Sequence, residues 1–232
     1  MNQKRSKRYQ QAAKIVEAKK SYAFEDAIKT LKTLPAAKFD ESLSLALKLT
    51  VDPKQSDQMV RGTVVLPHGS GKNVKVLVFA KGKAADQARE AGAEHVGFEE
   101  MIKKCQEGFQ DFDVAIATPE AMQEVRKLGK VLGPRGLMPN PKTGTVTDDT
   151  AKAVKECKAG RVEFKIDKAA NLHVSFGKRS FSDSQLIENG RAVIESILKA
   201  RPASAKGGFI ARAVISATQS PGFNIDLNEF KN

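Results

Sequence analysis

The stretch Leu43-Ser44-Leu45-Ala46-Leu47-Lys48-Leu49-Thr50-Val51 decides the fold of the first part of the chain. Apolar residues alternate with mostly polar ones, which predicts a strand with one buried face. Upstream, apolar residues at 24, 27, 28, 31 and 34 have helical spacing, and Pro35 ends that helix. A second strand is expected over 62–66. The first part of the chain therefore predicts a sheet covered by a helix.

The last part of the chain returns to the same kind of pattern. Residues 161–167 and 171–176 alternate and predict a hairpin. The run Ser182-Asp183-Ser184-Gln185 is a capping-box pattern that precedes a helix with one apolar stripe. A further strand is expected over 209–218. Both ends therefore predict an antiparallel sheet with helices.

The middle of the chain alternates strand and helix. Strands are expected over 74–80 and 113–117, and helices over 84–91 and 98–107, with Thr118-Pro119 opening a further helix. Strands separated by helices imply a parallel sheet with helices on its faces and right-handed crossovers. The pattern is consistent with one discontinuous domain, formed by both ends, into which an α/β middle is inserted.

The charge of the chain indicates a polyanionic partner. The 232 residues include 39 Lys and Arg against 27 Asp and Glu, a net charge of +12. The net charge is +6 over 1–67, +2 over 68–159 and +4 over 160–232. We therefore expect the polyanion at the two ends of the chain. A membrane surface is disfavoured, because no long basic amphipathic helix and no apolar run of about 18 residues occurs.

Motifs for enzyme or metal chemistry are weak. Two cysteines and three histidines are scattered without metal-ligand spacing or a disulfide framework, and no cofactor is implied. The run Gly69-Ser70-Gly71-Lys72 resembles a phosphate loop, but Leu66 and Asn73 stand where glycine and a hydroxyl residue are required. A basic α/β enzyme acting on a nucleotide or small substrate stays as the alternative function. A general nucleic-acid chaperone is a third class.

Three segments are candidates for a binding surface. Residues 130–144 hold three prolines and three glycines, which predict a rigid non-helical loop that is either functional or a packed surface element. Lys38 beside Phe39 suits contact with phosphate and with sugar or base, although a phenylalanine at a strand start also suits a core. Residues 216–222 are small hydrogen-bonding groups that allow close approach of a ligand or form a simple turn.

Taken together, these segments resemble the L1 family of bacterial large-subunit ribosomal proteins over essentially the whole chain. The loop Leu132-Gly133-Pro134-Arg135-Gly136-Leu137-Met138-Pro139-Asn140-Pro141 is the family signature. The resemblance also rests on these runs: 4–9, 37–41, 57–63, 66–69, 158–164 and 205–207.

The resemblance implies an α/β protein of two domains. Residues 1–67 and 160–232 would form a discontinuous α+β domain, an antiparallel sheet with helices that carries both termini and binds RNA. Residues 68–159 would form an inserted Rossmann-like, three-layer α/β domain. The implied hinge residues are Pro67, His68, Gly69 and Gly160, and the signature loop contains Gly133, Pro134, Arg135, Gly136 and Pro139.

The resemblance also implies the partners. They are the stalk region of large-subunit rRNA, the protein's own operon mRNA, whose binding makes it a translational repressor, and exit-site tRNA. The free protein would be a monomer in the cytoplasm or on the ribosome, with no enzymatic activity. The implied RNA-binding residues are Lys38, Phe39, Arg212, Thr218, Gln219, Ser220 and Glu25, with Lys4, Arg5, Lys7 and Arg8 adding charge. Many relatives have Thr-Met-Gly-Pro where this chain has residues 218–221.

Overall fold

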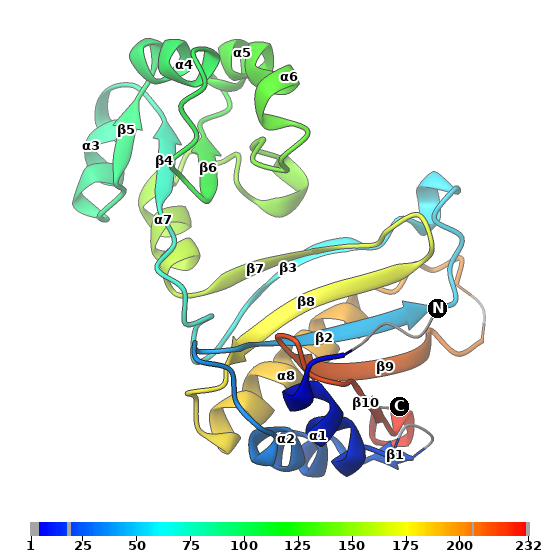
Figure 1. Cartoon of the computed structure of the whole chain (residues 1–232). Helices are drawn as coiled ribbons and strands as arrows, with labels where there is room; N and C mark the ends of the chain where they lie inside the picture. Colours follow the sequence, from blue (N-terminus) through cyan, green and yellow to red (C-terminus); the bar gives the residue numbers. More distant parts are fainter. Residues whose placement is uncertain (1–4, 18–19, 206, 231–232) are drawn as a thin grey trace. The chain divides into compact units, whose positions relative to one another are not determined.

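The computed structural model describes residues 5–17, 20–205 and 207–230, without the side chains of Ser56 and Lys142. The chain divides into two compact units. The first combines Met1–Gly71 with Val162–Asn232, and the second is Lys72–Arg161 (Figure 1). The first unit is therefore discontinuous in sequence, and each unit mixes helices with strands.

The first unit is built on a five-stranded sheet of order β1-β10-β9-β2-β8. Its strands are β1 (Ser21–Tyr22), β2 (Ser42–Leu49), β8 (Asn171–Lys178), β9 (Ile210–Ala217) and β10 (Phe223–Ile225). Its helices are α1 (Lys7–Ile15), α2 (Phe24–Thr33) and α8 (Asp183–Lys199). Strands β3 (Arg61–Val65) and β7 (Arg161–Lys165) form a separate two-stranded sheet. Short 3-10 turns occupy Ser56–Gln58 and Leu227–Phe230.

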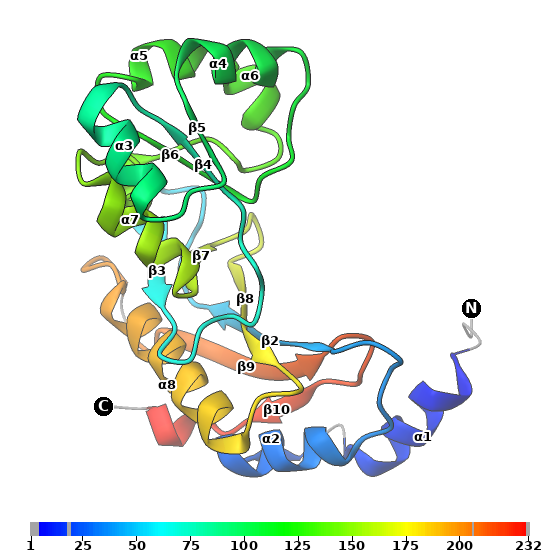
Figure 2. The ribbon, with the colours of Figure 1, turned by 90° about the vertical axis from the view of Figure 1, so that its left-hand side faces the viewer.

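The alternation of the strand residues decides which face of this sheet is buried. Leu43, Leu45, Leu47 and Leu49 of β2 are buried against α2 and α8, which pack on the same side of the sheet (Figure 2). A run of four leucines at period two removes one complete face of the strand from water. The helix and strand predicted over 24–34 and 43–51 are confirmed, as is the capping box of Ser182 and Gln185 at the start of α8.

The predicted hairpin over 161–176 is wrong. Strand β7 pairs with β3, whereas β8 pairs antiparallel with β2, so consecutive strands belong to different sheets. Asp167 closes the connection between them by accepting hydrogen bonds from the backbone N–H groups of Ala169 and Asn171 at 2.8 and 2.7 Å. Local alternation predicts the strands but cannot assign their partners, because pairing depends on chain segments that lie far apart.

The second unit has three layers. A parallel sheet of order β5-β4-β6 contains β4 (Val76–Phe79), β5 (His95–Gly97) and β6 (Val114–Ala117). Its helices are α3 (Gly82–Glu90), α4 (Glu99–Gln106), α5 (Met122–Val125), α6 (Gly129–Leu132) and α7 (Thr150–Lys158). Leu77 and Phe79 of β4 pack in the core that α4, α5 and α6 contribute to, whereas Val76 and Val78 face α3 and α7. The parallel sheet predicted for the middle of the chain is confirmed.

Two details of the second unit differ from the sequence-based prediction. Pro119 does not open a helix, because residues 119–121 form a turn and α5 begins at Met122. The segment 130–144 is not wholly non-helical, because Lys130 to Leu132 belong to α6 and the proline-rich part begins after Gly133. Proline and glycine limit helix extension but do not prevent a helix from ending within the same segment.

A buried carboxylate ties the first unit together. The Glu41 side chain, immediately before β2, is 0% exposed and lies 3.1 Å from the guanidinium of Arg8 and 3.0 Å from that of Arg179. Its Oε1 also accepts a hydrogen bond from the backbone N–H of Ala37 at 2.6 Å. Arg179 donates further to the carbonyl groups of Lys32 and Leu34. One carboxylate thus joins α1, the end of α2, the start of β2 and the end of β8.

We predict that Glu41→Ala lowers the free energy of unfolding of the first unit by about 3–5 kcal/mol. The substitution leaves two largely buried guanidinium groups without their shared counter-charge. Urea unfolding followed by tyrosine fluorescence measures this unit selectively, because the two tyrosines, Tyr9 and Tyr22, both lie in it.

The matched control is Glu17→Ala, which removes an exposed carboxylate 4.0 Å from Lys20 in the same unit. This exposed pair is expected to contribute less than about 1 kcal/mol. Equal unfolding midpoints for the two variants would contradict a central role for Glu41.

Candidate nucleic-acid interface

The start of β2 lies beside the ends of β8 and β9. Ser42 is in register with Lys178 and Leu43 with Ala217. Antiparallel pairing therefore brings together three segments that lie far apart in sequence: residues 37–42, 178–180 and 217–220. We call this group the strand-end surface. It contains Lys38, Phe39, Thr218, Gln219 and Ser220, five of the candidates expected to contact RNA.

Hydrogen bonds to the β2 backbone fix the turn after β9. The Thr218 hydroxyl accepts from the backbone N–H of Ser42 at 3.1 Å and lies 3.3 Å from its carbonyl oxygen. The Thr218 backbone N–H donates to the same carbonyl at 3.1 Å. The Ser220 hydroxyl accepts from the backbone N–H of Ala217 at 2.9 Å. The turn is therefore held in one geometry before any ligand arrives.

Gln219 is held by the buried Glu41 cluster. Its side-chain oxygen accepts a hydrogen bond from Arg8 at 2.9 Å, and the same guanidinium group contacts Glu41. Gln219 has a φ of 61°, a left-handed conformation that is uncommon for residues other than glycine. Arg8 is therefore committed to internal contacts, and it shares the single carboxylate of Glu41 with Arg179.

Phe39 and Lys38 project from the rigid frame of the strand-end surface. Phe39 is 52% exposed, so it is not part of the hydrophobic core. Lys38 is exposed as well. On the neighbouring side, Asp40 accepts from the backbone and hydroxyl of Ser180 at 3.1 and 2.8 Å, which anchors the loop that carries them. The arrangement presents an aromatic ring and a cation beside hydroxyl groups.

The open face of the five-stranded sheet continues this polar surface. It carries the partly exposed side chains that alternate with the buried apolar ones: Ser42, Ser44, Lys48, His173, Ser175, Arg212, Val214 and Ser216. Ser44 and Ser175 face each other across β2 and β8, with 3.3 Å between their hydroxyl oxygens. The polar residues at alternate positions of these strands indicate a solvent-exposed face. The strands were predicted from their apolar residues alone, so this face was missed.

Two predicted site residues lie away from the strand-end surface. Arg212 stands six residues before Thr218 on β9, about 20 Å away in an extended strand, and its guanidinium group donates to the Asn224 side chain. Glu25 lies at the start of α2 and pairs with Arg191 of α8 at 2.9 Å, on the helical side of the sheet. The structure therefore does not bring Arg212 and Glu25 together with Phe39.

The basic N-terminal residues have different environments. Lys4 lies outside the described residues. Ser6 caps α1 by accepting from the backbone N–H of Tyr9, and the Arg5 guanidinium stacks on the Tyr9 ring at 4.3 Å. Arg5 and Lys7 are both exposed. These two side chains supply positive charge beside the strand-end surface, to which Arg8 connects α1.

The predicted hinge residues are held by α8. The fully buried side chain of Asn189 accepts from the His68 backbone N–H at 3.0 Å and donates to the carbonyl groups of Gly69 and Phe176 at 3.0 and 2.9 Å. Pro67, His68 and Gly69 thus belong to the first unit, whose boundary falls after Gly71. Gly160, with a φ of 101°, follows the end of α7 in the second unit.

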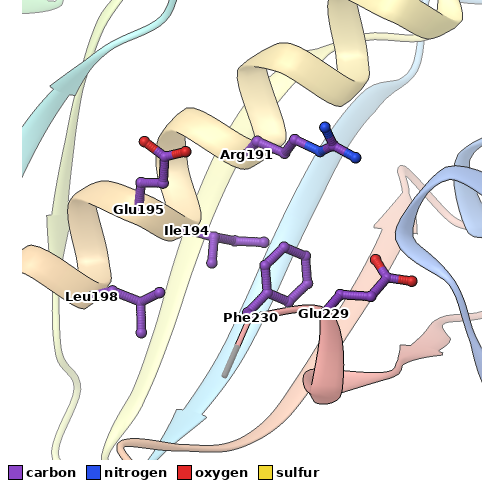
Figure 3. Close-up of a pocket in the computed structure, with 6 residues that line it drawn as sticks. All are labelled: Arg191, Ile194, Glu195, Leu198, Glu229 and Phe230. Atoms are coloured by element: carbon purple, nitrogen blue, oxygen red, sulfur yellow. The ribbon is translucent and has the colours of Figure 1, made fainter. Parts of the chain in front are cut away.

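One pocket of the first unit does not suit an anionic ligand. It lies between α8 and the C-terminal turn, has a volume of about 410 Å³, and contains two glutamates (Figure 3). Arg191 is paired with Glu25, and Glu229 accepts from the Phe24 backbone N–H at 3.3 Å. The Phe230 ring packs edge-on against Phe24, with 5.8 Å between centroids. The pocket therefore results from the packing of the C-terminal turn against α8 and Phe24.

The described part of the chain fits neither of two kinds of reactive centre, a metal site or a nucleophilic cysteine. There, no group of three or more His, Cys, Asp or Glu side chains is arranged to hold a metal ion. Burial raises the pKa of the Cys105 and Cys157 thiols, which disfavours the nucleophilic thiolate. Over the same residues, no helix has the length and apolar character of a membrane span.

Comparison with known proteins identifies the family. The profile of the family described as "Ribosomal protein L1p/L10e family" matches residues 29–221. "Large ribosomal subunit protein uL1" of Kosmotoga olearia is 55% identical over 223 residues, which cover 96% of each chain. The protein of the same description from Lactobacillus delbrueckii subsp. bulgaricus is 53% identical with the same coverage. The chain therefore belongs to the ribosomal protein L1p/L10e family and is a structural, non-enzymatic component of the large ribosomal subunit in the cytoplasm.

Proposed function

We propose that the first unit binds the stalk region of large-subunit rRNA through the strand-end surface and the adjoining open face of the sheet. The observation that carries this proposal is the exposed Phe39 beside Lys38, held on a frame fixed by Glu41 and Thr218. A solvent-exposed aromatic ring next to a cation and several hydroxyl groups matches the groups that folded RNA offers: bases, phosphates and 2′-hydroxyls.

Each part of the surface has a distinct task in this proposal. Lys38, with Arg5 and Lys7, neutralises phosphate charge and gives a salt-dependent contribution to affinity. Phe39 packs on an exposed sugar or base. Thr218, Gln219 and Ser220 present a preformed turn whose shape selects folded RNA. Because the frame is ordered in advance, little conformational entropy is lost when the RNA binds.

Three finer roles rest on the family resemblance. The same surface would bind a similar fold in the protein's own operon mRNA and thereby repress its translation. The protein would assist movement of tRNA at the exit site of the ribosome. The second unit would move on a hinge, for which the chain after Gly71 is a better candidate than Pro67–Gly69, because Asn189 holds the latter.

A filter-binding assay tests the proposed function. It compares a transcript of the stalk region, a scrambled RNA of equal length and duplex DNA at two salt concentrations. Selective binding of the stalk transcript that persists at the higher salt supports the proposal. Equal binding of all three indicates a general nucleic-acid chaperone instead. Nucleotide binding or turnover without RNA selectivity would support the alternative enzyme class.

We predict that Phe39→Ala weakens binding of the stalk transcript by about 1–3 kcal/mol, through loss of base or sugar contact. The thermal unfolding midpoint should not change, because the ring is about half exposed. Phe39→Tyr is the matched control and should retain affinity. A lowered unfolding midpoint with unchanged affinity would instead make Phe39 a structural residue.

We also predict that Thr218→Val weakens binding of the stalk transcript by about 1–3 kcal/mol, because the Ser42 backbone N–H loses its hydroxyl partner and the turn loosens. Thr218→Ser keeps the hydroxyl and should bind nearly as the parent protein does. Filter binding measures the affinity, and tyrosine fluorescence checks that the first unit stays folded. Parent-like affinity of the valine variant would remove Thr218 from the site.

A further inference from the structure

Helix α1 buries little of its own surface. Among the described residues of this helix, Ala12 is the only buried one, and Ile15 at its end is 46% exposed. A helix of nine residues has little stability without tertiary contacts. Arg8 stands four residues before Ala12 and therefore lies on the same side of the helix. The position of α1 in the first unit thus depends largely on Arg8.

The guanidinium group of Arg8 contacts two different parts of the unit. Its Nη1 lies 3.1 Å from the Glu41 carboxylate and donates to the carbonyl oxygen of Pro35 at 3.3 Å. Its Nη2 donates to the side-chain oxygen of Gln219 at 2.9 Å and to the backbone carbonyl oxygen of Gln219 at 3.4 Å. A planar guanidinium held at both nitrogens has a fixed orientation. Gln219 therefore fixes the half of this group that Glu41 does not contact.

The turn after β9 is built so that Gln219 meets Arg8. Gln219 and Ala170 are the two non-glycine residues with a positive φ in the described part of the chain, and φ is 61° at Gln219. Such a conformation costs free energy and persists only where its surroundings hold it. The hydroxyl groups of Thr218 and Ser220 anchor the turn on both sides of Gln219. Figure 2 shows α1 at the end of the sheet where this turn joins β9 to β10.

Two exposed cations depend on where α1 lies. Lys7 is the first residue of the helix, and the guanidinium group of Arg5 stacks on the ring of Tyr9, 4.3 Å from its centroid. Charges held in place lose less conformational entropy on binding than charges on a loose segment do. A fixed α1 therefore makes these cations more effective partners for phosphate.

We propose that Gln219 is a positioning residue, whose side chain fastens α1 through Arg8. Arg5 and Lys7 are thereby held beside the strand-end surface, where they meet phosphates of the bound RNA. The part that concerns RNA rests on the proposed function, whereas the fastening of α1 does not. Gln219 thus acts on the protein's own N-terminal helix.

Hydrogen–deuterium exchange of the α1 amides in the free full chain tests the fastening. Gln219→Met removes the acceptor oxygen at nearly constant side-chain length, and Gln219→Gly removes it while relaxing the positive φ. In both variants the α1 amides should exchange about fivefold faster, as expected for the loss of one hydrogen bond to a partly exposed partner. Faster exchange in the methionine variant but not in the glycine variant would overturn the proposal, because backbone strain would then explain it.

Gln219→Glu is the conservative variant. It keeps an acceptor oxygen and adds a charge opposite Arg8, so the α1 amides should exchange no faster than in the parent protein. Gln11→Met is the matched control, because it makes the same side-chain change at an exposed position of α1 itself and should leave the exchange unchanged. Circular dichroism checks that all variants are folded. Faster exchange in all four variants, or in none of them, would contradict the proposal.

Binding of the stalk transcript at several salt concentrations tests the consequence for RNA. In Gln219→Met, the slope of log affinity against log salt should flatten by about 1–2, up to one unit for each of Arg5 and Lys7. Weaker binding with an unchanged slope would refute the positioning of these cations, because a damaged turn alone has that effect. Failure of the parent protein to bind the transcript would refute the proposed function and this consequence. Exchange in the free protein would still decide whether Gln219 fastens α1.

Discussion

The ionic contact between buried Glu41 and the guanidinium groups of Arg8 and Arg179 is the constraint on which the first unit depends. A charge that is completely removed from water must be paired and hydrogen-bonded, or its burial costs several kcal/mol. Here the pairing also has a geometric result. Arg8 belongs to the N-terminal helix, Glu41 precedes β2, and Arg179 follows β8, so one cluster positions three segments separated by up to 171 residues. The same Arg8 reaches the turn after β9 through Gln219.

The proposed RNA site is built on this cluster and does not include it. The guanidinium groups of the cluster are held by internal contacts, whereas Lys38 and Phe39 extend outward from the loop that Glu41 and Asp40 anchor. This division explains why Arg8, although basic and N-terminal, is a positioning residue. It also gives a physical reason why Gln219 is acceptable in a left-handed turn position: its side chain and carbonyl both interact with Arg8, which offsets the backbone strain.

The two units distribute positive charge differently. In the first unit, cations are spread over the N-terminal segment, the strand-end surface and the open face of the sheet. The second unit is closer to balance, with 16 basic and 13 acidic residues over 72–161. The basic composition of the chain therefore comes mainly from the first unit, which carries +9 of the net charge of +12.

The sequence by itself determined the helices and strands that have strong periodicity, the parallel sheet of the middle segment and the concentration of charge, because each of these depends on neighbours along the chain. It did not determine strand partners: the segments around 164 and 174 look like a hairpin, yet they pair with β3 and β2. Only the tertiary structure paired Arg212 with Asn224 and turned Arg8 inward to Glu41. Residue type specifies what a side chain can contact, but burial and long-range strand pairing decide what it does contact.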